Sequence, residues 1–194
     1  MLVTGLRPSR RDPMLVVVEV DGARFVEVPR DEARKLGVAG GVELSDALVA
    51  DLRAAGEAEA AYQVALRMLA HRPHAVAEVV RKLRQKGHGK YAVAKAVGRL
   101  ESSGVLDDAE FARHFVRVRA PKGFGPPRLL RDLLGRGIER RAAERAIAEV
   151  VESDEVDLSR QRAALAEKRA RQLHGLPERV VKRRVAGYLR RRGL

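Results

Sequence analysis

The sequence predicts a mainly α-helical protein, built of tandem three-helix repeats that form an elongated curved array, with a small β-hairpin at its N-terminal end. Three observations support this prediction. Hydrophobic residues make up 45% of the chain and aromatic residues only 4%, so the core has to be built from Leu, Val and Ala, which suits helix packing. One short motif closes helices at three places in the chain. Two β-branched runs flank a tight-turn dipeptide near the N-terminus.

The tight-turn dipeptide predicts the hairpin. Residues 14–28 contain two Val-rich runs on either side of Asp21-Gly22, and such an arrangement is the strongest short-range hairpin signal. The preceding residues 1–13 show no periodicity and include Pro8 and Pro13, so we expect them to be a flexible tail.

Two helices are expected after the hairpin. The first covers residues 31–36. The second begins at Asp46 and runs to about residue 55, with Ser45 as its N-cap and acidic side chains in its first turn. Together with the hairpin they form an N-terminal region of residues 14–56, since a two-stranded hairpin is not stable alone and has to pack on neighbouring elements.

A repeated pentamer defines the rest of the chain. Each copy begins with Leu and ends with Gly, and the Gly follows the last helical turn, where it can adopt the left-handed conformation that closes a helix. Another helix precedes each copy, across a turn that contains Pro. A third helix follows the first two copies, at about residues 90–101 and 139–151, but not the last. The copies are Leu83-Arg84-Gln85-Lys86-Gly87, Leu133-Leu134-Gly135-Arg136-Gly137 and Leu189-Arg190-Arg191-Arg192-Gly193.

The pentamers divide the helical region into three repeats. We expect them at residues 57–104, 107–152 and 154–194, the third being shorter. The second opens with Asp107-Asp108-Ala109-Glu110, a capping-box pattern. Capping explains these adjacent carboxylates better than acid–base chemistry does, because no matching base lies near them in the sequence.

The net charge of +13 is unevenly distributed. Acidic side chains outnumber basic ones by three in residues 1–59, and basic ones outnumber acidic ones by ten in residues 160–194. A generic bias toward Arg would not leave the first segment acidic. The gradient therefore predicts an acidic or polyanionic partner for the C-terminal part.

The basic residues cluster on three predicted helices. Two Arg/Lys triplets on the last helix repel each other, which favours a functional role over a merely solvated face. The candidate residues for binding a partner or nucleic acid are Arg81, Lys82, Arg84, Lys86, Arg140, Arg141, Lys182, Arg183, Arg184, Arg190, Arg191 and Arg192.

Several functional classes lack their sequence signals. The chain contains no Cys, and its five His residues do not form a His-Glu-x-x-His motif, so we expect no metal site. Nucleotide-binding and nucleophile motifs are missing as well, which predicts a protein that is not an enzyme and has no cofactor. No apolar run is long enough to span a membrane, and the N-terminus does not resemble a signal peptide, so we expect a cytoplasmic protein.

Several segments of the chain follow one another in an order and spacing that are fairly specific. They are Ala61 to Pro73, Glu78, Leu83-x-x-Lys86-Gly87, Leu100-x-x-x-Gly104-Val105-Leu106-Asp107-Asp108, Phe111-Ala112, Gly123 to Pro126, Leu133-x-x-x-Gly137-Ile138 and Leu189-x-Arg191-Arg192-Gly193-Leu194. Together these segments resemble the RecX family, and the resemblance covers about residues 40–194.

The resemblance implies a regulator of the RecA recombinase in DNA repair, recombination and the SOS response. RecX-like proteins consist of tandem three-helix repeats, bind the RecA filament on single-stranded DNA, and restrain ATP hydrolysis and strand exchange. Some also bind DNA, so single-stranded DNA and double-stranded DNA are candidate partners beside RecA. No membrane partner is implied, and we expect a monomer.

Two other interpretations remain open at this stage. Three-helix units with basic helices also occur in stand-alone helix-turn-helix-like DNA-binding proteins, which bind DNA tightly and with strong salt dependence. A protein–protein scaffold without nucleic acid is the third interpretation. It predicts that neutralising Arg190, Arg191 and Arg192 changes nothing.

Overall fold

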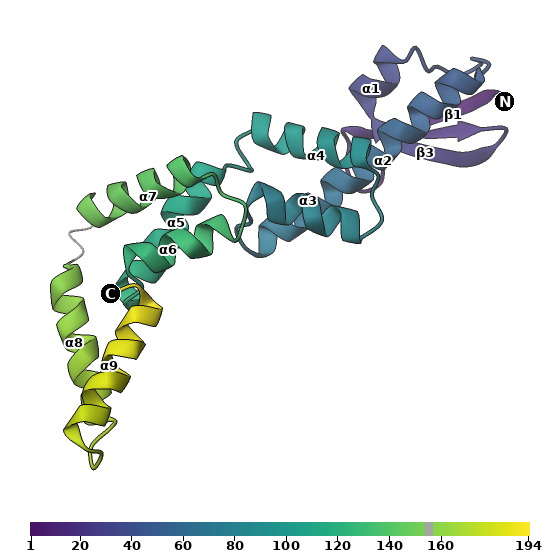
Figure 1. Cartoon of the computed structure of the whole chain (residues 1–194). Coiled ribbons are helices and arrows are strands. Elements are labelled where there is room, and N and C mark those ends of the chain that lie inside the picture. The colour runs from purple at the N-terminus through teal and green to yellow at the C-terminus, as the bar shows by residue number, and fades with distance from the viewer. Residues whose placement is uncertain (154–156) are drawn as a thin grey trace. The chain divides into compact units, whose positions relative to one another are not determined.

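The computed structural model describes residues 1–153 and 157–194, in which three strands precede a series of helices (Figure 1). The elements are β1 (Val3–Pro8), β2 (Leu15–Val20), β3 (Ala23–Pro29), α1 (Arg30–Lys35), α2 (Asp46–His71), α3 (Val76–Gln85), α4 (Lys90–Ser102), α5 (Asp108–Arg119), the short 3₁₀ helix η1 (Ala120–Lys122), α6 (Pro126–Leu134), α7 (Arg140–Ser153), α8 (Leu158–Arg171) and α9 (Glu178–Arg192). The mainly helical fold expected from the sequence is confirmed.

Strands β1, β2 and β3 form an antiparallel sheet in this order. The predicted β2–β3 hairpin is confirmed, since Asp21 and Gly22 have φ angles of 49° and 81°, as a type I′ turn requires. The flexible tail expected at residues 1–13 is wrong. Residues 3–8 form β1, which pairs with the outer edge of β2, and Val3 is fully buried in the core below the sheet.

Helix α2 is much longer than the sequence predicts. It continues through Gly56 to His71, although an interior Gly disfavours a helix by about 1 kcal/mol relative to Ala. A side chain at Gly56 would overlap that of Val26 on β3, so Gly lets the helix and the sheet pack closely. The boundary expected between residues 56 and 57 therefore falls inside one helix.

The chain divides into two compact units. Unit 1 comprises Met1–His74 and Val79–Leu106, with α2 packed against β3 on one side and against α4 on the other. Unit 2 comprises Ala75–Glu78 and Asp107–Leu194. The repeat limits of 57–104, 107–152 and 154–194, and the elongated curved array, stay predictions.

Helix α7 packs on both α5 and α6 in unit 2. The resulting core is aliphatic and aromatic, with Phe111, Phe115, Leu129, Leu133 and Ile147 all buried. In the remaining part of this unit, α8 and α9 pack against each other without a third helix among the described residues.

The predicted caps are confirmed at several helix ends. Gly87, Gly137 and Gly193, the last residues of the three pentamers, have φ angles of 90°, 85° and 76°. Ser45 Oγ accepts a hydrogen bond from the Leu48 amide, and Asp107 Oδ1 accepts from the amides of Ala109 and Glu110. Glu110 does not complete the capping box, because its carboxylate pairs with Arg113.

Candidate partner-binding surface

The first basic cluster lies on α3 and in the turn that follows it. Val79 and Leu83 anchor this helix by their buried side chains, so Arg81, Arg84 and Lys86 face solvent and Lys82 is half-buried. None of the four basic side chains has an ion pair with a described residue. Three of the four, Lys82, Arg84 and Lys86, lie at the C-terminal end of the helix, where the helix dipole favours positive charge.

The second cluster opens α7. Arg140 and Arg141 are exposed in the first turn, which contains no acidic residue. Cations at a helix N-terminus oppose the helix dipole, at a cost of about 0.3–1 kcal/mol each. Arg140 recovers part of this cost in a 3.3 Å ion pair with Glu144, whereas Arg141 has no ion pair within the described part of the chain. The position of these two charges is therefore unfavourable for the helix itself.

The third cluster covers α9. Arg183 and Arg190, and likewise Arg184 and Arg191, are seven residues apart and therefore share a face of the helix. All four are exposed and have no ion pair with described residues. Lys182 is exposed but pairs with Glu178 at 2.6 Å, and pairs of this kind in solvent contribute little stability.

Arg192 differs from the other eleven candidates, because its guanidinium points into unit 2. Nη1 donates a 2.6 Å hydrogen bond to the Lys122 carbonyl, and the group lies over the rings of Phe124 and Tyr188, at 5.2 and 4.9 Å from their centroids. This residue holds the end of α9 against the loop before α6. We therefore assign Arg192 a structural role and remove it from the candidate set.

Sequence reasoning missed the arginine–aromatic contacts of which Arg192 is part. Arg119 lies 4.6 Å from the centroid of Phe115 and 5.5 Å from that of Phe124. The guanidinium of Arg136, which follows the C-terminal end of α6, lies 4.8 Å from the centroid of the Phe115 ring. A signal was present for two of these pairs, since Phe115–Arg119 and Tyr188–Arg192 have the i,i+4 spacing of neighbours on a helix face.

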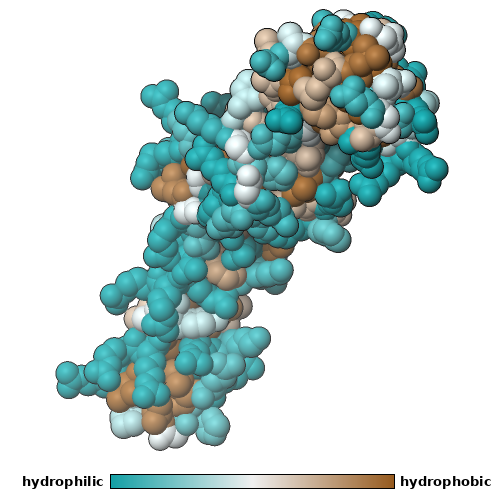
Figure 2. Space-filling view, turned by 90° about the vertical axis from the view of Figure 1, so that its right-hand side faces the viewer, coloured by the Kyte–Doolittle hydropathy of each residue, from teal (hydrophilic) through white to brown (hydrophobic). Residues whose placement is uncertain are grey.

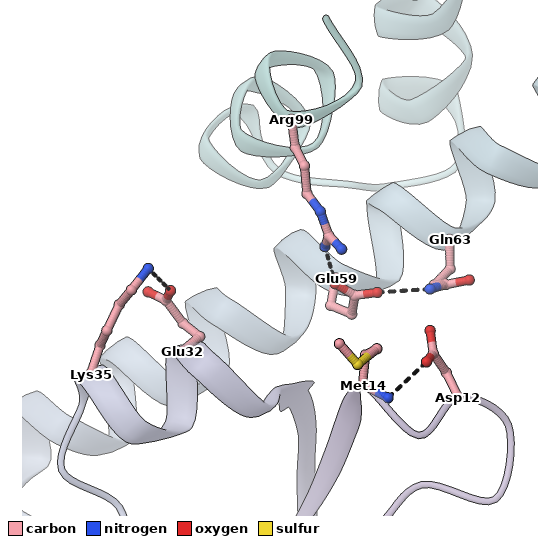
Figure 3. Close-up of polar contacts among 7 residues, drawn as sticks. All are labelled: Asp12, Met14, Glu32, Lys35, Glu59, Gln63 and Arg99. Carbon is pink, nitrogen blue, oxygen red and sulfur yellow. Dashed lines mark hydrogen bonds and ion pairs between the residues drawn. The ribbon is translucent and has the colours of Figure 1, made fainter. Parts of the chain in front are cut away.

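A polar clamp in unit 1 was missed as well (Figure 3). Glu59 on α2 is only 4% exposed, and its carboxylate accepts hydrogen bonds from Arg99 on α4 at 2.7 Å and from Gln63 at 2.8 Å. The Arg99 guanidinium also lies 3.8 Å from the centroid of Tyr62. A buried carboxylate that lost its cation would strongly destabilise the fold, so this clamp joins α2 and α4 structurally.

The carboxyl of Asp108 has a raised pKa. Burial raises the pKa of its carboxyl, the hydrogen bond from the Val76 amide lowers it, and the neighbouring Asp107 raises it. The bond to Val76 is 2.9 Å long and caps the start of α3. The structural interpretation of Asp107 and Asp108 is thus supported by their contacts.

Membrane-spanning and metal-binding features are missing from the described residues. No described helix combines the length and apolar character that a bilayer crossing needs. Across residues 1–153 and 157–194, His, Asp and Glu side chains do not gather in threes to form a metal site.

Two family models match the helical part of the chain. Residues 61–100 match the first three-helix domain of RecX, and residues 107–147 match the second. A regulatory protein RecX from Halorhodospira halophila is 38% identical over 141 residues, which is 72% of this chain and 84% of that protein. One from Geobacillus kaustophilus is 32% identical over 92% of this chain and 66% of its own length.

Solved structures agree with these sequence matches. A crystal structure of regulatory protein RecX superposes with a TM-score of 0.83 at 21% identity, covering 100% of this chain and 94% of the other. RecX from Lactobacillus salivarius gives a TM-score of 0.61 at 22% identity, over 71% of this chain and 88% of the other. At such identities the likeness concerns the fold.

Proposed function

This chain belongs to the RecX family of non-catalytic regulators that modulate the RecA recombinase, and on that premise we propose that it binds the RecA filament on single-stranded DNA and restrains ATP hydrolysis and strand exchange. It acts in the cytoplasm, as a monomer, on a partner that exposes acidic protein surface and phosphates. The sequence matches to relatives, over most of the chain, support the regulatory role.

The observation that carries the proposed contact is the exposed basic face of α9. Arg183, Arg184, Arg190 and Arg191 lie on one helix without acidic neighbours to neutralise them. Such a row is favourable for a phosphate backbone or an acidic protein surface and unfavourable otherwise. The clusters on α3 and at the start of α7 extend the proposed contact to both units.

Restraint of RecA needs only differential binding. A ligand shifts its target toward the conformation that it binds more tightly, by an amount set by the difference in affinity. A basic protein that contacts the filament in a conformation slow to hydrolyse ATP therefore lowers the rate without any catalytic group of its own.

The test measures RecA ATP hydrolysis on single-stranded DNA while this protein is titrated in at low salt. We expect inhibition at stoichiometric amounts. The double variant Arg190→Ala/Arg191→Ala should need roughly tenfold more protein, since loss of about 1.4 kcal/mol of binding corresponds to that factor. The control Arg10→Ala/Arg11→Ala removes the same charge from exposed positions of the N-terminal region and should inhibit like the unmodified protein. Unchanged hydrolysis at stoichiometric amounts would refute the proposal.

The second candidate function is stand-alone DNA binding, which the basic α3 favours because helices of three-helix units commonly enter a DNA groove. It predicts tight binding to naked double-stranded DNA that weakens steeply with salt. Fluorescence anisotropy with labelled DNA, with and without RecA, separates the two. Weak binding to naked DNA together with capture by RecA filaments decides for the filament regulator.

A further inference from the structure

An unfilled groove runs between α8 and α9. Its volume is about 610 Å³. Figure 2 shows that apolar residues at the α8–α9 end of the molecule lie within a frame of hydrophilic ones. The groove is lined by Arg162, Ala166, Glu167, Ala170, Val181, Lys182, Val185, Ala186, Leu189, Arg190 and Leu194. Its floor is thus made of small and aliphatic side chains, and its charged residues are mostly basic.

The preceding repeat indicates what kind of element fits on such a pair of helices. There α7 packs on both α5 and α6, and Ala143, Ala146, Ile147 and Val150 are its buried residues. No described helix takes this place on α8 and α9. Accordingly α8 has no buried residue, and Leu189 is the one buried residue of α9.

The two third helices of the chain share one burial pattern. Val93, Ala96, Val97 and Leu100 are buried on α4 at the spacing i, i+3, i+4 and i+7, as are the four residues of α7. Small residues at the second position of this pattern allow close packing of the helix backbone. The Ala residues at positions 166, 170 and 186 leave matching space in the groove.

The charged residues of the groove determine which side chains are favoured beside the apolar stripe of a bound segment. Arg162 and Arg190 line it without ion pairs to described residues, whereas Glu167 is neutralised by Arg171 at 3.0 Å. An occupant therefore gains from Asp or Glu beside its apolar stripe. A nucleic acid could use the arginines but would leave the apolar floor uncovered.

We propose that the α8–α9 groove binds an acidic amphipathic helix of a partner protein, which takes the place that α7 has on α5 and α6. The helix carries small and aliphatic residues at i, i+3, i+4 and i+7 and acidic residues on either side. The groove shares Arg190 with the filament contact proposed above, and the peptide assay below tests the groove without RecA.

The experiment uses the full chain and a fluorescein-labelled synthetic peptide of about 18 residues, long enough to form several helical turns. The peptide carries the pattern Val-x-x-Ala-Val-x-x-Leu with Glu at the flanking positions, and binding is measured by anisotropy. Ala186→Glu places a carboxylate in the groove, at an exposed position that the fold tolerates. It should weaken binding at least tenfold. Ala163→Glu, exposed on α8 outside the groove, adds the same charge and should change binding less than twofold.

Four results would overturn the proposal. One is that the peptide fails to bind. Another is that a peptide with the same composition but scrambled apolar positions binds equally well, which would reduce the effect to charge. The third is equal weakening by both variants while circular dichroism shows both to be folded. Dimerisation that Ala186→Glu abolishes, measured by sedimentation, would make a second copy the occupant and overturn the commitment to an acidic helix.

Discussion

The α5–α7 repeat and the α8–α9 pair of unit 2 are held together in different ways. In the first, α7 completes a core in which Leu129 and Leu133 are fully buried. In the second, Leu173 and Leu189 are each 7% exposed and are the only buried hydrophobic residues among described positions 157–194. A third helix thus changes a two-helix surface into a core.

Polar contacts with the neighbouring loop replace that core for α9. The Gly125 amide donates a 2.8 Å hydrogen bond to the Arg192 carbonyl, and Arg128 Nη1 donates one of 3.4 Å to the Arg191 carbonyl. A Cβ atom at Gly125 would overlap the carbonyl of Gly193, so this approach requires a glycine. The comparison shows that a helix pair without a third helix among the described residues can be fixed at one end while an apolar groove stays exposed.

Matched leucines of the pentamers give the largest expected difference. Leu133→Ala should lower the local free energy of unfolding by about 3 kcal/mol, because it empties a fully buried site in the α5–α7 core. Leu189→Ala should lower it by only about 1–2 kcal/mol, because the surface around it is open and collapses more easily. Hydrogen exchange of the α7 and α9 amides measures the two losses separately.

Val118→Ala serves as the control, because it replaces an apolar residue by Ala on a helix without emptying a buried site. Val118 is 42% exposed on α5, so its change should stay within about 0.5 kcal/mol. Equal losses for Leu133→Ala and Leu189→Ala would contradict the distinction between a closed core and an open pair.

Local signals made part of this fold predictable. The turn at Asp21-Gly22, the N-caps Ser45 and Asp107, and the closing glycines act through atoms a few residues away, so the sequence displays both partners together. The RecX resemblance likewise came from motif order and spacing, and the family matches confirm it.

Features that depend on distant partners were not predictable in this way. Strand β1 has no alternating pattern and exists because β2 offers it an unpaired edge. Helix α2 passes through Gly56 because of Val26, and Arg192 turns inward because of a loop about 70 residues earlier in the chain. Arg192 looks in the sequence like its neighbours Arg190 and Arg191, which stay exposed.

A pair of arginine variants tests how α9 is attached. Arg192→Ala should lower the local free energy of unfolding of α9 by about 1–2 kcal/mol, because it removes the hydrogen bond to the Lys122 carbonyl and the contacts with Phe124 and Tyr188. Arg190→Ala, on an exposed position of the same helix, should change it by less than about 0.5 kcal/mol. Hydrogen exchange of α9 reports both, and an equal effect would show that the inward guanidinium does not hold the helix.

The smallest expected effect on stability concerns the aspartates that cap the starts of α8 and α3. Asp157 caps its own helix α8 through the Arg160 amide, whereas half-buried Asp108 reaches the Val76 amide. Asp108→Asn keeps an acceptor for that amide and removes the buried charge. Because burial raises the pKa of Asp108 in the folded protein, the unmodified protein bears a penalty above that pKa which the Asn variant lacks.

The variant Asp108→Asn should therefore be equal or more stable at neutral pH, by less than about 1 kcal/mol. Its advantage should shrink as the pH falls from neutral through the raised pKa of Asp108 toward the ordinary value of 3.8, since Asp108 then takes up its proton in the folded state. Urea unfolding of both proteins between pH 7 and pH 4 measures this difference. Asp108→Ala, which loses the acceptor, should cost about 1 kcal/mol at neutral pH. An advantage of Asp108→Asn that grows on acidification would contradict burial as the cause of the raised pKa.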